Sequence, residues 1–306
     1  MLGVMMKIDH GNVRALAAVI REGSFERAAA SLNVTPSAVS QRIKALESRI
    51  GRLLVQRTVP AVATQEGRVL VQLADQTALL EHDALSRLGL EGNTISSVSV
   101  AVAVNHDSLE TWFMTAVNYF AQRSRATLDV QSEDQDHTAT LLRNGAVLGA
   151  VTTLSDAVQG CRLHALGSMR YVATCSPEFH ERYFSSGVTA RSLAKAPVLV
   201  FNRKDALQFR FAKKVMGNAL WQPPVWWLPS SRAFVQATLD GLGWTMNPLP
   251  LVQDDLEAGR LVLLRARAKE DVPLYWQHWG VNSEALAALT DSVLAAAADS
   301  GLVRGR

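Results

Sequence analysis

The stretch from Phe25 to Glu47 constrains the fold more than any other part of the sequence, because two helix starts lie close together in it. Ser24 stands where an N-cap belongs, immediately before the first of these helices. Thr35 is a second N-cap, and Pro36 suits the first helical position because its missing N–H costs nothing there. The sequence therefore predicts two short helices joined by a tight turn, the arrangement of a helix-turn-helix.

The second helix has one apolar and one polar face. It is expected to bury Val39, Ile43 and Leu46 and to expose Ser37, Ser40, Gln41 and Lys44. Polar side chains of this kind can reach base edges in the major groove of DNA, and cationic side chains such as Arg27, Lys44 and Arg57 neutralise phosphates. Residues 1–67 carry nine Lys or Arg against five Asp or Glu, in a chain of net charge +3. Period and capping alone fit an ordinary small helical bundle equally well.

The pattern of residues in this stretch resembles the LysR-type transcriptional regulators. The matching positions are Phe25, Ala28, Ala29, Leu32, Val34, Thr35, Ser37, Ala38, Val39, Ser40, Ile43, Leu46, Glu47, Gly51, Leu54 and Arg57. The resemblance implies a winged helix-turn-helix over residues 1–67 that binds double-stranded DNA, although Ala63 stands where the family's wing usually has Leu. The DNA-binding residues that it implies are Arg27, Thr35, Pro36, Ser37, Ser40, Gln41, Lys44, Arg57 and Thr64.

A long amphipathic helix is predicted from Gln65 to Leu88, because this stretch has no proline and its apolar residues recur every three or four positions. Such a stripe needs a partner, which is either the body of the same chain or a second copy. The resemblance implies a second copy, joined through linker helices over residues 65–89. We therefore expect a homodimer or a tetramer, whose paired heads match a two-fold operator, with RNA polymerase as a further partner.

Strand and helix patterns alternate with short loops over residues 95–306, which predicts an α/β fold with a largely parallel sheet. Strands are expected at 98–104, 128–132, 146–153, 171–175, 197–201, 225–228, 245–247, 261–264 and 274–279, and a last helix at 284–298. The resemblance implies an effector domain of two periplasmic-binding-protein-like subdomains. The first would cover residues 95–166 and 269–300, and the second residues 167–268.

Polar residues gather in the loops where such a fold binds a ligand, at the carboxyl ends of strands and at helix starts. The candidate effector-binding residues are Asn105, Asp107, Ser108, Glu133, Asp134, Asp136, Thr152, Ser230 and Ser231. The hydroxyls near two helix starts can hold a carboxylate, although N-capping alone explains either pair. The acidic residues can pair with a cationic group, although a solvated loop explains an acidic run equally simply.

Several segments of the C-terminal half resemble one branch of the family, the regulators called LysG or ArgP. They are residues 57–60, 104–112, 133–134, 145–151, 195–198 and 274–276. This resemblance implies that lysine, arginine or histidine controls an amino-acid exporter gene through this protein, with Ser108 and Ser231 on the α-carboxylate. Arg232 departs from the branch, where an acidic residue often follows the hydroxyl pair, so a different small carboxylate is the alternative ligand.

The rest of the sequence argues against other classes of protein. It has no secretory signal and no apolar run that could cross a bilayer, so we expect a cytoplasmic protein without a membrane partner. Cys161 and Cys175 make no disulfide framework, and His106 and His137 lack metal-ligand spacing. No phosphate loop or nucleophile elbow is found. We therefore expect no catalytic residues, no metal and no cofactor, and an enzyme tethered to DNA is the least favoured alternative.

Overall fold

The computed structural model describes residues 8–90, 98–133, 138–217, 221–266 and 269–303, which form two compact units. The first unit comprises residues 1–104, 117–163 and 276–292. The second unit comprises residues 105–116, 164–275 and 293–306.

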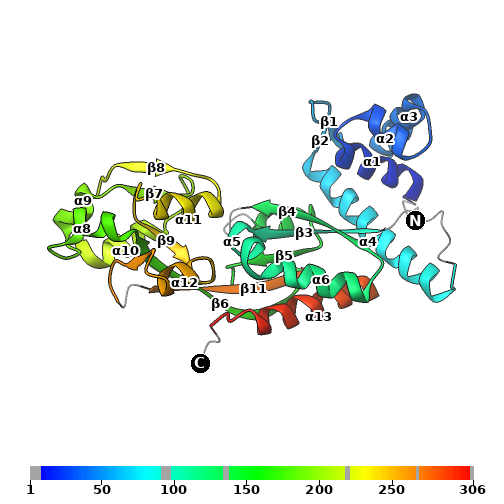
Figure 1. Ribbon diagram of the computed structural model, residues 1–306. Helices are drawn as coiled ribbons and strands as arrows, with labels where there is room; N and C mark the ends of the chain where they lie inside the picture. Colours follow the sequence, from blue (N-terminus) through cyan, green and yellow to red (C-terminus); the bar gives the residue numbers. More distant parts are fainter. Residues whose placement is uncertain (1–7, 91–97, 134–137, 218–220, 267–268, 304–306) are drawn as a thin grey trace. The chain divides into compact units, whose positions relative to one another are not determined.

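The first unit begins with a helical head followed by a two-stranded wing and a long helix (Figure 1). Its elements are α1 (His10–Glu22), α2 (Phe25–Ser31), α3 (Pro36–Ile50), β1 (Val55–Gln56), β2 (Val62–Ala63) and α4 (Gln65–Arg87). The strands β1 and β2 pair antiparallel, with Val55 opposite Ala63. The structure therefore confirms the predicted winged helix-turn-helix and the predicted long helix after it.

Local chemistry explains where the helices of the head begin and end. The Ser24 hydroxyl accepts the N–H of Arg27 at 3.1 Å, and the Thr35 hydroxyl accepts the N–H of Ala38 at 3.2 Å. Gly23 ends α1 in the left-handed conformation, with φ of 69°, which costs least for glycine. Val39, Ile43 and Leu46 of α3 are buried in the core of the head, as predicted. Each such side chain stabilises the fold by about 1.5–3 kcal/mol.

The start of α4 lies directly against the wing. The Thr64 hydroxyl accepts the N–H of Gly67 at 3.0 Å and donates to the carbonyl of Leu53 at 2.8 Å. A Cβ atom on Gly67 would lie only 2.0 Å from the carbonyl oxygen of Leu54, so only glycine fits there. This close approach fixes the wing against the first turn of α4.

The remaining residues build a mixed α/β region. Its elements up to the first long strand are β3 (Ser99–Asn105), α5 (His106–Ser108), the π-helical turn η1 (Leu109–Phe113), α6 (Met114–Arg123), β4 (Thr127–Glu133), α7 (Thr138–Arg143) and β5 (Gly149–Thr152). The later elements are β6 (Cys161–Cys175), α8 (Pro177–Phe184), α9 (Ala190–Lys195), β7 (Val198–Val200), α10 (Leu207–Met216), β8 (Val225–Trp227), α11 (Ser231–Leu239), β9 (Thr245–Pro248), α12 (Leu249–Glu257), β10 (Val262–Leu263), β11 (Lys269–Trp279) and α13 (Glu284–Asp299).

The larger sheet is mixed, which corrects the expectation of a largely parallel sheet. Its strand order is β10-β6-β11-β5-β3-β4, and β9 also pairs with β6. The pairs β3–β5 and, in a separate sheet, β7–β8 are parallel, whereas β6 pairs antiparallel with both β9 and β10. The expected α/β effector region is present, with helices between most of its strands.

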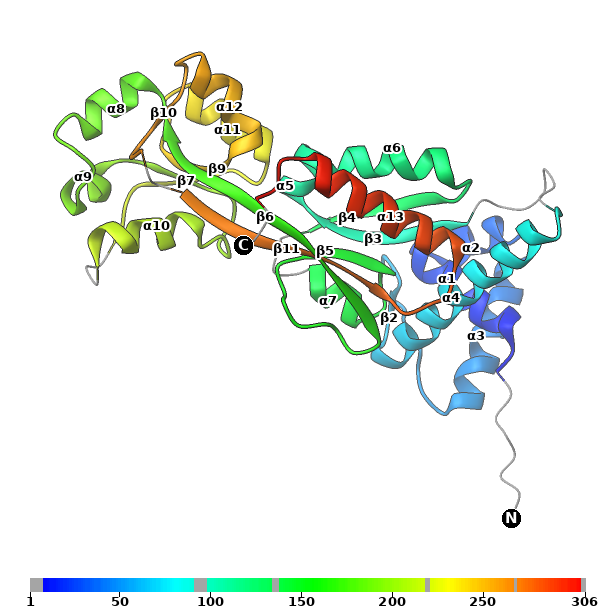
Figure 2. The ribbon, with the colours of Figure 1, turned by 90° about the horizontal axis from the view of Figure 1, so that it is seen from below.

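Two strands are much longer than predicted (Figure 2). β6 begins at Cys161 rather than near residue 171, and β11 begins at Lys269 rather than near residue 274. In each strand the added part is mostly half-buried or exposed, so it lacks the continuous apolar run that marks a buried strand. The sequence signal therefore covered only the most apolar end of each strand.

Replacing Gly67 with Ala tests the contact between α4 and the wing. The added methyl group must displace the Leu54 backbone, and overpacking of this kind costs about 1–3 kcal/mol. We expect a lower midpoint of thermal unfolding by differential scanning calorimetry. The exposed, uncharged neighbour Gln65 supplies the control, because Gln65→Ala should leave the midpoint nearly unchanged. An unchanged midpoint in Gly67→Ala would contradict the packing described.

Candidate functional site

The first candidate surface is the polar face of α3 in the head. Ser37, Gln41 and Lys44 are exposed and Ser40 is half-buried, at the spacing that places all four on one side of the helix. Arg57 comes from the wing, and its guanidinium lies 5.1 Å from the centre of the Phe25 ring. This stacking holds a positive charge on the wing. The surface presents hydrogen-bonding side chains flanked by cations.

Two residues predicted to bind DNA have structural contacts of their own. The hydroxyls of Thr35 and Thr64 cap α3 and α4, respectively. Sequence reasoning gave Glu47 no function beyond its place in the pattern. Its Oε1 atom accepts the N–H of Leu54 at 2.9 Å and so ties α3 to the start of the wing. These contacts set the position of the α3 surface.

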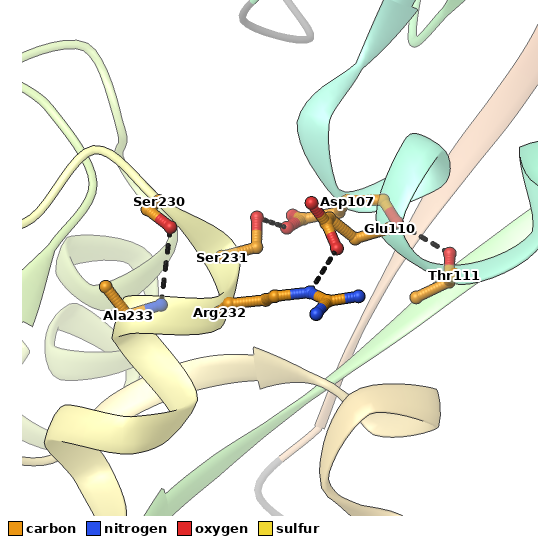
Figure 3. A network of polar contacts seen from close by, with 7 residues as sticks. All are labelled: Asp107, Glu110, Thr111, Ser230, Ser231, Arg232 and Ala233. Atoms are coloured by element: carbon orange, nitrogen blue, oxygen red, sulfur yellow. Dashed lines mark hydrogen bonds and ion pairs between the residues drawn. The ribbon is translucent and has the colours of Figure 1, made fainter.

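The second candidate site is built around the Asp107 carboxylate in the second unit. Its Oδ1 atom accepts a hydrogen bond from the Ser231 hydroxyl at 2.8 Å (Figure 3). Its Oδ2 atom accepts one from the Tyr171 hydroxyl at 2.6 Å. The three residues come from α5, from the first turn of α11 and from β6, so segments far apart in the sequence converge on one carboxylate.

Burial controls the protonation of this cluster. Desolvation raises the pKa of the Asp107 carboxyl, and the hydrogen bonds from Tyr171 and Ser231 offset part of that rise. Burial also raises the pKa of Tyr171 well above its ordinary value, and the negative charge of Asp107 adds to the effect. Tyr171 therefore stays a neutral donor toward Asp107 at neutral pH.

Three buried polar atoms close to Asp107 in the sequence have no hydrogen-bond partner among the described residues. They are Oδ1 of Asn105, Oγ of Ser108 and Nε1 of Trp112. These side chains are at most 3% exposed. Buried polar groups are nearly always hydrogen-bonded in native proteins, and each exception needs an explanation. All three fall within residues 105–112, the stretch that also carries Asp107.

The two serines before and in α11 have different roles. The Ser230 hydroxyl accepts the N–H of Ala233 at 3.3 Å and caps the helix, whereas Ser231 turns to Asp107. The side chain of Arg232 is 85% exposed, and its Nε lies 2.9 Å from Oε2 of Glu110 (Figure 3). Arg232 stands where related sequences often have an acidic residue, and its positive charge is offset by the neighbouring Glu110 carboxylate.

The structure assigns two other predicted effector-binding residues, Thr152 and Glu133, to the first unit. Thr152 is buried in the first unit and its hydroxyl accepts the N–H of Leu154 at 3.1 Å, while Glu133 of that unit is exposed. Asp134 and Asp136 lie outside the described residues. Among the described residues, no group of three or more His, Cys, Asp or Glu side chains is arranged to hold a metal ion. No helix in that part of the chain is long and apolar enough to span a membrane.

Sequence reasoning missed two members of the polar cluster. Tyr171 lies within a strand, where an aromatic residue is most simply explained as core. Glu110 stands in the π-helical turn, where the Thr111 hydroxyl donates to the carbonyl of Asp107 at 2.6 Å. Turns of this type are frequent at functional sites, but nothing in the local sequence predicts them. A buried tyrosine hydroxyl needs a hydrogen-bond partner, and this requirement was the one signal that could have pointed to Tyr171.

Two family models match the chain. Residues 11–68 match "Bacterial regulatory helix-turn-helix protein, lysR family", and residues 96–298 match "LysR substrate binding domain". The chain is also 42% identical over 282 residues to the "Lysine export transcriptional regulatory protein LysG" of Corynebacterium glutamicum. This match covers 92% of this chain and 95% of that protein.

Solved structures agree with these matches. The crystal structure of ArgP from Mycobacterium tuberculosis has a TM-score of 0.84 and 45% identity, and the match covers 98% of this chain and 100% of that one. Full-length LysG from Corynebacterium glutamicum with bound effector Arg has a TM-score of 0.75 and 39% identity, and the match covers 97% and 100% of the two chains. The chain therefore belongs to the LysR family, and it is a DNA-binding transcriptional regulator related to LysG and ArgP.

Proposed function

We propose that this regulator senses a basic amino acid, arginine or lysine, at the Asp107 cluster of its second unit. The observation that carries the proposal is the buried Asp107 carboxylate, together with its sequence neighbours Ser108 and Asn105, whose buried Oγ and Oδ1 atoms have no partner among the described residues. A basic amino acid offers both ammonium donors for the carboxylate and amide oxygens and a carboxylate acceptor for the Ser108 hydroxyl. The bound Arg in the related LysG of Corynebacterium glutamicum supports the same ligand class.

The electrostatics of the cluster suit a cation. The Asp107 carboxylate accepts hydrogen bonds from the hydroxyls of Tyr171 and Ser231, and both of these donors are neutral. Arg232 is paired with Glu110 and is mostly exposed, so solvent and its partner weaken its repulsion of a cationic ligand. A charge-assisted hydrogen bond to a buried carboxylate is stronger than one between neutral groups.

Removal of the Ser108 hydroxyl tests the site. We expect Ser108→Ala to weaken arginine binding about tenfold or more, because a hydrogen bond to a charged group contributes about 1.5–3 kcal/mol. Isothermal titration calorimetry measures this affinity. The variant Ser186→Ala, at an exposed serine of the same unit, should bind arginine like the unaltered chain.

A separate experiment tests the class of ligand. A thermal-shift series with arginine, lysine, histidine and an aromatic carboxylate compares the candidates, because a bound ligand raises the unfolding midpoint. A shift with the aromatic acid and none with the basic amino acids would overturn the proposed ligand but leave the regulator class intact.

We further propose that the target is an amino-acid exporter gene, which the regulator activates together with RNA polymerase. The name of the related lysine export regulator supports this choice. On the DNA, the proposed base-reading residues are Pro36, Ser37, Ser40 and Gln41 of α3. Arg27, Thr35, Lys44, Arg57 and Thr64 are proposed to contact the DNA backbone, with Thr35 and Thr64 also serving as the caps described above.

The variant Gln41→Ala tests the assignment of α3. We expect about a tenfold loss of affinity for the region upstream of the exporter gene, since a bidentate base contact contributes about 1–3 kcal/mol. Mobility shift with that fragment and with unrelated DNA separates specific from general binding. Ser48 lies near the other end of α3, and Ser48→Ala should leave specific binding unchanged. Equal losses in both variants would contradict the assignment.

We propose a homodimer, or a tetramer built from such dimers, through the exposed face of α4. Val69 is 63% exposed and Leu80 is 48% exposed, although both are large apolar residues. They lie eleven residues apart, which places them on the same side of the helix. An apolar stripe on an exposed helix is covered most simply by the same stripe of a second copy.

A charge on this stripe should separate the copies. We expect the Val69→Glu, Leu80→Glu double variant to sediment as a monomer in analytical ultracentrifugation, because a carboxylate is costly to bury in an apolar interface. Leu53→Glu adds the same charge at a residue of the head that is 72% exposed, and it should keep the oligomer. An unchanged oligomer in the double variant would place the interface elsewhere.

A further inference from the structure

A buried carboxylate on α4 lies outside both candidate sites. Asp83 is 6% exposed, and an aspartate is almost never buried so deeply unless it is paired. Its Oδ2 atom accepts the backbone N–H of Glu284, the first residue of α13, at 2.8 Å. Both residues belong to the first unit. The linker helix thus supplies an acceptor to the start of a helix that is two hundred residues away in the sequence.

The first turn of α13 needs such an acceptor. The first four N–H groups of a helix have no partner within it, and a negative charge near them is stabilising. Ser283 is the local cap, and its hydroxyl accepts only the N–H of Leu286, at 3.4 Å. The N–H of Glu284 is satisfied by Asp83. The bond is charge-assisted and shielded from water, so it contributes more than a bond between neutral exposed groups.

A second contact joins the same two helices on the surface. Nε of Arg87 lies 2.8 Å from Oε1 of Glu284, with side chains 68% and 58% exposed. Ion pairs with this exposure contribute little to stability. Of these two polar contacts between α4 and α13, the buried bond from the Glu284 N–H to Asp83 is therefore the stronger.

The other end of α4 packs against the DNA-binding head. Leu70 and Ala74 are part of the buried core that α1 and α3 share, and Arg21 of α1 pairs with Asp75 of α4 at 2.8 Å. Burial raises the pKa of the Asp75 carboxyl, and its partner Arg21 offsets part of that rise. A helix that is fixed to the head at one end and to α13 at the other connects the two mechanically.

We propose that Asp83 and the N-terminus of α13 form a latch that fixes the DNA-binding head to the effector region, and that opening of the latch frees the head. The proposal goes beyond the sensing of a ligand, because it assigns the connection through which the effector region restrains the head. Asp83 is a positioning residue in this account, and it contacts neither DNA nor effector.

The latch can be tested from both of its sides. Asp83→Ala removes the acceptor. Glu284→Pro removes the donor, because proline has no N–H, and proline is well tolerated at the first position of a helix. Glu284→Gln keeps the N–H and removes only the surface ion pair with Arg87. Glu81→Ala removes an exposed acid of α4 two residues before Asp83 and controls for the change in charge.

The distance between head and effector region is the readout. Spin labels go on Ser48→Cys in α3 and Gln122→Cys in α6, both exposed, in a chain whose Cys161 and Cys175 are replaced by Ala. Pulsed electron paramagnetic resonance then measures the distance distribution, with labelled chains diluted in unlabelled ones to suppress distances between copies. Neither effector nor operator is needed, so failure of the proposed function does not affect the result.

We expect one narrow distance population in the unaltered chain, Glu284→Gln and Glu81→Ala. We expect loss of that population in Asp83→Ala and in Glu284→Pro, with helix content by circular dichroism unchanged in the proline variant. If the contact only stabilised the fold, its loss would lower the unfolding midpoint, but the narrow distance population would remain at temperatures below that midpoint. Retention of the narrow population in Glu284→Pro would overturn the latch, even if Asp83→Ala failed to fold.

Discussion

The hydrogen-bonded burial of Asp107 is the constraint on which the sensing part of the molecule depends. A buried carboxylate is tolerated only where donors compensate for its lost hydration. Here the donors are the hydroxyls of Tyr171 and Ser231. Because those residues lie on β6 and at the start of α11, the carboxylate fixes where two distant segments of the second unit meet α5. The same requirement makes the cluster sensitive to any ligand that competes for the carboxylate.

The chemistry of the cluster follows from that arrangement. Burial raises the pKa of Asp107, while Tyr171 is kept protonated and remains a donor. A cationic ligand adds a third donor to a carboxylate whose two oxygen atoms still have free lone pairs. Ser108 and Asn105, close to Asp107 in the sequence, carry further buried polar atoms without a partner among the described residues. A cationic donor forms a stronger hydrogen bond to this carboxylate than a neutral one does, which together with the bound Arg of the related LysG is why we favour a basic amino acid.

Local sequence signals predicted the head well, because its helices are bounded by short-range chemistry. Ser24 and Thr35 are caps whose partners lie three residues away. Long-range pairs were not predictable in this way. Tyr171 looks like a core residue until Asp107 is placed beside it, and Asp83 looks like a surface acid of an amphipathic helix until α13 begins next to it. The sheet was wrongly expected to be largely parallel, because alternation of strands and helices does not reveal that β6 runs antiparallel to β9 and β10.

A crystal structure of the chain with bound arginine tests the central claim most directly. Our account predicts that a cationic group of arginine donates to the Asp107 carboxylate, within hydrogen-bond distance. It also predicts that Oγ of Ser108 and Oδ1 of Asn105 gain partners from the ligand or from water that the ligand orders. Arginine bound elsewhere, with Asp107 contacting only Tyr171 and Ser231 and with Ser108 still unpartnered, would contradict the account.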